Sequence, residues 1–173
     1  MNEVKSRKAG KNNLLFDFSV NKENKTIVVK KEFAANSQLV WDAWTKSELL
    51  DKWWAPLPYR NETISMNFIA GGAWHYAMVS PQGDKHFCKA YYQRIDALKM
   101  FSYKDAFCND QGEDLTEMPS MNWANTFTSN NGVTTVNVVL NFETVDQLEN
   151  IIKMGFKEGF TMGLSQLENL LQQ

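Results

Sequence analysis

The stretch that decides the fold is the C-terminal one, residues 145–171, which reads VDQLENIIKMGFKEGFTMGLSQLENLL. Apolar side chains recur in it at the three- and four-residue spacing of one helix face. They are Leu148, Ile152, Phe156, Phe160, Leu164, Leu167 and Leu171. Thr144 is the expected N-cap, with Gln147 three residues on, as in a capping box. The pattern predicts one long amphipathic helix, which needs an apolar surface to pack against.

The chain before this helix has the alternating pattern of β-strands. Leu14, Phe16, Phe18 and Val20 share one face of a first strand, and a second follows over residues 26–33 after a turn at 21–24. Further strands are predicted at residues 63–68, 73–79, 85–95, 100–105, 121–128 and 133–142. Short turns join neighbouring strands, so the predicted sheet is antiparallel.

Two short helices separate the second strand from the rest of the sheet. Asn36 or Ser37 is the expected N-cap of the first helix, and the second runs from about residue 47 to 53, before Pro56. Strands and helices are thus segregated along the chain, which is typical of α+β folds. The predicted architecture is a curved antiparallel sheet wrapped around a long C-terminal helix, with two short helices after the N-terminal strand.

Composition limits the classes of function. A length of 173 residues suits one domain, and a net charge of −2 predicts no general attraction to nucleic acid or to anionic membranes. Cys88 and Cys108 lie in no C-x-x-C pattern, so we expect free thiols and a cytoplasmic location. Residues 1–13 are expected to be a flexible tail without the apolar segment of a secretory signal. Residues 14–173 are expected to form the single domain.

Several short motifs resemble those of a known family. They are residues 33–35 (FAA) with 40–45 (VWDAWT) and 49–54 (LLDKWW), then 71–76 (GGAWHY), then 154–160 (MGFKEGF). These are similar to the activator-of-heat-shock-protein-90-ATPase C-terminal-domain-like family, within the START-like (SRPBCC) helix-grip superfamily. Its members include a co-chaperone domain and stress- or antibiotic-related proteins. Asn36 departs from the family's usual proline, and Arg94 stands where an acidic or amide residue is more common.

The resemblance covers residues 26–171 and implies a seven-stranded sheet that grips the C-terminal helix, with a pocket between them. The strand at residues 14–20 is expected to be an addition to that sheet. The predicted ligand-binding lining of this pocket is Trp53, Trp54, Trp74, Tyr76, Met78, Tyr92, Arg94, Trp123, Phe127, Phe156, Gly159 and Phe160. Each aromatic among them has two interpretations, as pocket wall or as core filler.

Three glycines recur at four-residue spacing on one face of the predicted helix. Gly155, Gly159 and Gly163 each cost about 1 kcal/mol relative to alanine in a helix interior, so something has to offset that cost. Close approach of the helix to the sheet and a wider pocket are both interpretations of the pattern.

Signals for metal binding or catalysis are weak. His75 and His86 are the only histidines, and no set of His, Cys, Asp and Glu has metal-ligand spacing, so neither metal nor cofactor is predicted. We group Asp105 with the acidic loop at 109–114 and interpret it as a solvated turn. The sequence has no Gly-x-Ser-x-Gly motif, and Cys88 has no evident activating base, so no catalytic residue is predicted.

The leading hypothesis is a non-catalytic binding module that holds a small hydrophobic or amphipathic ligand in a cavity between sheet and helix. One alternative, from the resemblance, is a protein-interaction domain that acts on a chaperone ATPase; another is an enzyme of unknown reaction that uses the cavity. The resembled co-chaperone works with an N-terminal partner domain that this sequence lacks, so we expect the chain alone not to stimulate that ATPase. The expected partner is a small apolar molecule, and we expect binding to neither nucleic acid nor membranes. The chain is expected to be a monomer or a homodimer.

Overall fold

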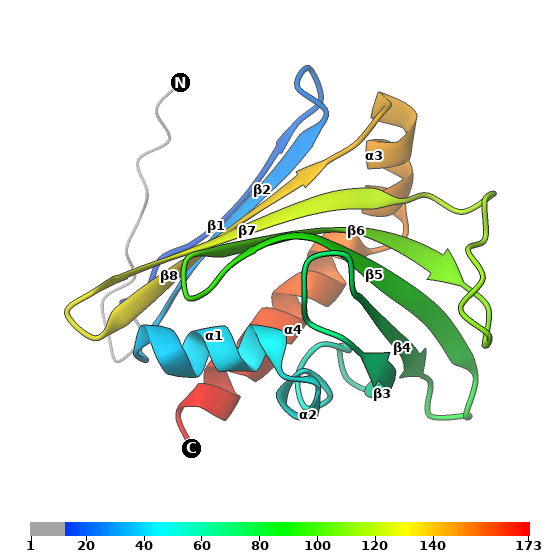
Figure 1. The fold of residues 1–173 in the computed structure, drawn as a ribbon. Helices are drawn as coiled ribbons and strands as arrows, with labels where there is room; N and C mark the ends of the chain where they lie inside the picture. The colour runs from blue at the N-terminus through cyan, green and yellow to red at the C-terminus, as the bar shows by residue number, and fades with distance from the viewer. Residues whose placement is uncertain (1–12) are drawn as a thin grey trace.

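The computed structural model describes residues 13–173, which form a curved antiparallel sheet bent over a C-terminal helix (Figure 1). Its strands are β1 (Phe16–Asn21), β2 (Thr26–Phe33), β3 (Arg60–Met66), β4 (Ala73–Val79), β5 (Lys85–Asp96), β6 (Met100–Cys108), β7 (Met121–Asn130) and β8 (Val133–Asn141). The predicted α+β helix-grip class is confirmed. The tail predicted for residues 1–13 lies, except for Asn13, outside the described residues.

The strands follow the order β1-β2-β8-β7-β6-β5-β4-β3 across the sheet. Six consecutive strands, β3 to β8, form a meander, and the N-terminal hairpin of β1 and β2 is added to it beside β8. The side chains of β2 alternate between fully and partly buried, and its pairing places Ile27 opposite Leu140, two side chains with no exposed surface. Burial of one face thus sets the register of this long-range pairing.

Four helices cover the concave side of the sheet: α1 (Ser37–Thr45), α2 (Ser47–Leu50), α3 (Val145–Lys153) and α4 (Phe156–Leu171). Both predicted N-caps are present, because Asn36 Oδ1 accepts from the Leu39 N–H at 2.9 Å and Thr144 Oγ1 accepts from the Gln147 N–H at 3.1 Å. The second short helix ends at Leu50, earlier than predicted, and continues as turns. No helix within residues 13–173 is long and apolar enough to cross a membrane.

The C-terminal segment is two helices, so the prediction of one continuous helix was wrong. Gly155 has a φ of 86°, in the left-handed region that glycine adopts at little cost, and it separates α3 from α4. The apolar stripe continues across the break, and Leu148, Phe160 and Leu167 are buried as expected. Near the break Ile152 and Phe156 are only partly buried.

Helix α4 is fastened to the loop that follows α2. The side chain of Gln166 donates to the carbonyl oxygens of Trp53 at 3.1 Å and Ala55 at 2.9 Å, and its oxygen accepts from the Leu57 N–H at 2.9 Å. One turn earlier, a Cβ on Gly163 would lie only 3.4 Å from the Trp53 carbonyl oxygen. Gly163 therefore lies against the backbone of this loop.

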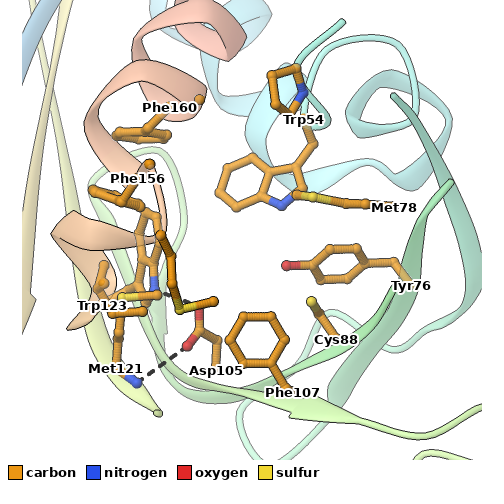
Figure 2. A pocket seen from close by; sticks show the side chains of 15 residues that line it. Trp54, Tyr76, Met78, Cys88, Asp105, Phe107, Met121, Trp123, Phe156 and Phe160 are labelled. Carbon is orange, nitrogen blue, oxygen red and sulfur yellow. Dashed lines mark hydrogen bonds between the residues drawn. The ribbon is translucent and has the colours of Figure 1, made fainter. Parts of the chain in front are cut away.

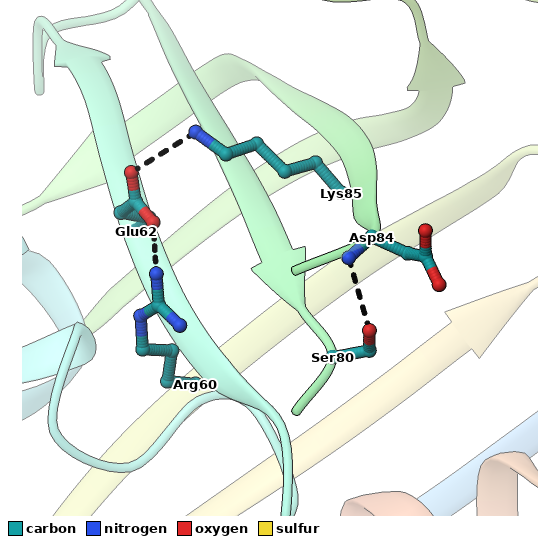
Figure 3. A network of polar contacts seen from close by, with 5 residues as sticks. All are labelled: Arg60, Glu62, Ser80, Asp84 and Lys85. Atoms are coloured by element: carbon teal, nitrogen blue, oxygen red, sulfur yellow. Dashed lines mark hydrogen bonds and ion pairs between the residues drawn. The ribbon is translucent and has the colours of Figure 1, made fainter. Parts of the chain in front are cut away.

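Strand β3 forms the edge of the sheet opposite β1, and it carries charged side chains that keep this edge solvated (Figure 3). The Glu62 carboxylate pairs with Arg60 at 3.2 Å and with Lys85 at 3.3 Å. In the next turn, Ser80 Oγ accepts from the Asp84 N–H at 3.0 Å and shapes the β4–β5 hairpin. Charges along the free edge of a sheet oppose its pairing with a strand of another chain.

Leu167→Ala tests the packing of α4 on the sheet. Leu167 has no exposed surface, so its truncation should lower the free energy of unfolding by about 2–5 kcal/mol. Met162→Ala on the exposed face of the same helix is the control and should change it by about 0.5 kcal/mol or less. Urea denaturation measures both, and equal losses would contradict the packing described here.

Candidate functional site

A pocket of about 230 Å³ lies between the concave face of the sheet and the start of α4 (Figure 2). Its floor comes from β4, β5, β6 and β7, and its roof from α4 and the loop after α2. The break between α3 and α4 is at its side, where Met154 and Gly155 line it. The pocket thus sits where three separate segments of the chain meet.

Strand register brings the floor side chains together. Tyr76 on β4 pairs with Cys88 on β5, and Cys88 pairs with Phe107 on β6. Two residues before Phe107, Asp105 pairs with Met121 on β7. Opposite residues of an antiparallel pair share one face, so all five side chains point to the same side of the sheet. Figure 2 shows them around the pocket, with the Tyr76 hydroxyl and the Asp105 carboxylate directed inward.

Aromatic rings form most of the roof and one wall. Phe160 packs against Trp54 and Trp123, with ring centroids 6.1 and 5.5 Å apart, and stacks on Phe156 at 5.2 Å. Gly159 lies between the two phenylalanines in sequence, and a Cβ there would be 3.6 Å from Pro56 Cγ, an ordinary contact distance. Gly159 lines the pocket, whereas Gly163 lies against the backbone of the loop after α2.

The structure brings part of the predicted lining together. Seven of the predicted residues line the pocket: Trp54, Tyr76, Met78, Trp123, Phe156, Gly159 and Phe160. They come from β4, β7 and α4 and from the loop after α2. Whether they bind a ligand stays a prediction at this point.

Four predicted aromatics lie in the core instead. Trp53 packs on Trp44 at 4.9 Å, and Trp74 stacks on Tyr76 at 3.9 Å behind the pocket wall. Tyr92 packs against Phe68 and Phe101, and Phe127 packs against Trp41 and Trp44. Trp53 and Phe127 thus pack on the tryptophans of α1, and Tyr92 packs on Phe68. The interpretation as core filler is the right one for these four side chains.

Arg94 does not line the pocket, and the prediction that it does was wrong. A β-bulge between Tyr92 and Arg94 shifts the register of β5 against β6, so that Ile95 rather than Arg94 lies opposite the buried Phe101. Arg94 is therefore exposed. An extra residue in one strand reverses the alternation beyond it, which a two-residue period does not reveal.

Eight lining residues were not predicted: Pro56, Cys88, Asp105, Phe107, Met121, Ile151, Met154 and Gly155. Of these, Asp105 matters most, and its assignment to a solvated turn was wrong. The strand β6 continues to Cys108, and the buried Phe101 and Tyr103 precede Asp105 on the same face. The two-residue period of Phe101, Tyr103 and Asp105 was the signal that could have found it.

The Asp105 carboxylate accepts two hydrogen bonds. Oδ2 accepts from the Trp123 indole N–H at 2.8 Å, and Oδ1 accepts from the Met121 backbone N–H at 3.2 Å. Burial raises the pKa of Asp105 to about 7, although these two donors act to lower it. By surface area the side chain is only partly buried, because the pocket reaches it, yet desolvation by the surrounding protein remains the dominant cause.

The other titratable groups of the pocket stay protonated near neutral pH. Burial, with the nearby Asp105, raises the pKa of the Cys88 thiol to about 12. Burial also raises the pKa of Tyr76 well above its usual value; Cys88 and Asp105 add to this, and the Trp54 indole opposes it. The Trp54 N–H approaches this phenol but completes no hydrogen bond of good geometry within residues 13–173. A thiol that holds its proton is a weak nucleophile.

A second, outer hollow of about 500 Å³ adjoins the pocket. The two spaces share Pro56, Met78, Phe107 and Met154. The outer hollow extends to Leu115, which is exposed on the loop after β6. A molecule too long for the pocket therefore has an apolar path outward past the shared residues.

Residues that could hold a metal are not gathered in the described part of the chain. Within residues 13–173, no group of three His, Cys, Asp or Glu side chains is close enough to ligate one ion. His75 lies on the opposite face of β4 from Tyr76, under the loop that contains Gly112. Cys88 and Cys108 are both free.

Comparison with known proteins places these features in a family context. The family model described as "Activator of Hsp90 ATPase homolog 1-like protein" matches residues 34–172. A solved protein from Staphylococcus epidermidis is 32% identical, with a TM-score of 0.78 over 89% of this chain and 93% of that one. One from Mycobacterium smegmatis is 25% identical, with a TM-score of 0.83 over 90% and 95%. No functionally curated protein matches the chain.

The buried carboxylate makes stability depend on pH. The pKa of Asp105 is about 7 in the folded protein and about 4 in an unfolded chain, so between these values the folded state binds the extra proton. Stability should therefore fall as pH rises from about 4 to about 7, by roughly 2–4 kcal/mol from this group. Asp105→Asn should remove that slope, and Asp110→Asn on the exposed loop should keep it. Urea denaturation at a series of pH values measures this slope. An equal slope in Asp105→Asn and in the wild type would disprove the raised pKa of Asp105.

Proposed function

The chain belongs to the Activator of Hsp90 ATPase homolog 1-like protein family, and on that premise we propose that it is a binding module for a small apolar or amphipathic molecule. The guest occupies the pocket between the sheet and α4. The family and its fold support ligand binding or protein interaction in general terms. The pocket carries the more specific proposal.

The main support for this proposal is the shape and chemistry of that pocket. Trp54, Trp123, Phe156 and Phe160 supply flat apolar walls, and Asp105 supplies a carboxyl group whose pKa is about 7. Ligand sites are typically concave, mainly apolar and equipped with few polar groups that orient the guest. The volume of about 230 Å³ is somewhat larger than the cavity of about 150 Å³ that holds a benzene molecule in another protein. A single ring with a short side chain therefore fits.

The protonation states of Cys88 and Tyr76 disfavour nucleophilic catalysis in this pocket. Cys88 and Tyr76 hold their protons near neutral pH, so neither supplies an anionic nucleophile. Asp105 is the one group near its titration range, and its two hydrogen-bond donors hold it in place. We infer a cytoplasmic location, which the two free thiols support.

Binding of n-propylbenzene tests this proposal. Removing about 200 Å² of apolar surface from water contributes about 5 kcal/mol, from which the entropy of association subtracts, so we expect a Kd in the micromolar range or weaker. The guest should quench tryptophan fluorescence, because Trp54 and Trp123 line the pocket. NMR chemical-shift changes should centre on Phe156 and Phe160.

Two variants of Gly159 make the test specific to this pocket. Gly159→Leu should fill the space and abolish binding, whereas Gly159→Ala should bind nearly as well as the wild type, because its Cβ has room beside Pro56. Both variants should be at least as stable as the wild type, since each removes a glycine from a helix. Unchanged binding by Gly159→Leu would remove the proposed site.

The second candidate function is interaction with a chaperone ATPase, and only the family description favours it. We expect the chain by itself to leave the ATPase rate of its cognate heat-shock protein 90 unchanged. A coupled ATPase assay measures this, with Gly159→Leu as the matched control. Stimulation by both proteins would establish an interaction that is independent of the pocket and would make this candidate the leading one.

A further inference from the structure

The buried carboxylate of Asp105 has no cationic partner. Within residues 13–173, no Lys, Arg or His nitrogen forms an ion pair with it. Its hydrogen-bond partners, the Met121 and Trp123 N–H groups, are neutral. Buried charges in proteins are usually paired, and an unpaired one costs several kcal/mol. The fold therefore keeps a carboxylate where it is unfavourable for stability, and places it in a pocket.

The hydrogen bonds prepare this carboxylate to act as an anion. Both oxygens accept from N–H donors, at 2.8 and 3.2 Å, and each oxygen keeps a further lone pair for another donor. Donors of this kind favour the charged form over the neutral acid. What the site lacks is a positive charge on the pocket side.

The surroundings of Asp105 suit a cation with an apolar body. In Figure 2 the rings of Tyr76, Phe107 and Trp123 and the side chain of Met121 surround the carboxylate. Aromatic faces attract ammonium groups and exclude water from the ion pair, which strengthens it. Beyond these rings, Phe156 offers apolar surface to the rest of the guest.

We propose that the pocket selects an amphipathic amine, a small molecule whose apolar body carries a protonated nitrogen, with Asp105 as its counter-ion. This rests on the binding function proposed above and names the class of guest. The nitrogen lies at the Asp105 end of the pocket, and the apolar body lies against the rings of α4. A longer body extends into the outer hollow past Met78 and Met154.

The other titratable groups that face Asp105 do not compete for the cation. They are Tyr76 on β4, Cys88 on β5 and Tyr103, its neighbour on β6. All three are protonated and neutral near pH 7, because burial raises the pKa of each. From β7 the carboxylate meets only N–H donors, and the pocket residues of α3 and α4 are apolar or glycine. Asp105 is thus the single anion available to the guest.

Binding and protonation are therefore linked. The pKa of free Asp105 is about 7, and an ammonium group beside the carboxylate lowers that pKa, so binding near neutral pH releases a proton. The amine keeps its own proton throughout this range. Affinity for the amine should rise with pH as Asp105 ionises and should level off above about pH 8.

A matched pair of ligands tests the proposal: 2-phenylethylamine and n-propylbenzene, which have similar shape and differ in charge. At about pH 8 we expect the amine to bind at least about tenfold more tightly than n-propylbenzene. At about pH 5.5 the affinity for the amine should be at least about tenfold lower than at about pH 8. The affinity for n-propylbenzene should not fall at low pH. Isothermal titration calorimetry in buffers of different ionisation enthalpy should show proton release when the amine binds and none when n-propylbenzene binds.

Two variants and one direct measurement complete the test. Asp105→Asn should abolish the preference for the amine, and Asp110→Asn, which removes the same charge from an exposed loop, should retain it. In the wild-type protein, an NMR titration of the Asp105 carboxyl carbon should show a lower pKa with the amine present. This measurement needs no substitution, so it decides the matter even if Asp105→Asn folds poorly.

The outcomes separate this inference from the proposed function. Binding of n-propylbenzene without any preference for the amine would overturn the inference and leave the binding module standing. Tighter binding of benzyl methyl ether at low pH would also overturn it, because Asp105 would then act as a neutral hydrogen-bond donor. Binding of neither aromatic ligand would remove the proposed function and the inference together.

Discussion

The attachment of α4 to the loop after α2 is the contact on which the rest of the structure depends. Gln166 holds the backbone of Trp53, Ala55 and Leu57, and Gly163 lies against the same loop. Two of these contacts provide partners for the carbonyl groups of Trp53 and Ala55, in a part-buried environment. They also hold Trp54 and Pro56 over the sheet. Between this attachment and the break at Gly155, the first turns of α4 stand away from the strands, and the pocket occupies that space.

Aromatic residues serve two purposes on the same concave surface. Toward α1, Phe127 packs edge to face on Trp41 and Trp44, with ring centroids 5.1 and 6.1 Å apart, and all three side chains are buried. Toward α3, the rings of Trp123 and Phe160 form walls with open volume between them. The difference lies in what covers the sheet: α1 carries Trp41 and Trp44, whereas α4 presents Gly159 to the pocket.

The polar content of the pocket also follows from the sheet. An aspartate on an inward-facing strand position costs stability, and the register places it beside two N–H donors rather than beside a lysine or arginine. Among residues 13–173, the most buried ion pair is between Lys31 and Glu168 at 2.9 Å, and it ties β2 to α4. The charges of Lys31 and Glu168 thus compensate each other, whereas the carboxylate in the pocket remains available to a guest.

The sequence by itself determined the class of fold, because periodicity and capping are local properties. The apolar stripe of residues 145–171, the N-caps Asn36 and Thr144 and the alternation of the strands are all visible in the chain. Only the tertiary structure decided which inward-facing residues line a pocket. That choice depends on the β5 bulge that turns Arg94 outward, on the left-handed Gly155 that divides the helix, and on the segments that cover each end of the sheet. Packing between segments distant in the sequence sets all three, and a local pattern carries no information about such contacts.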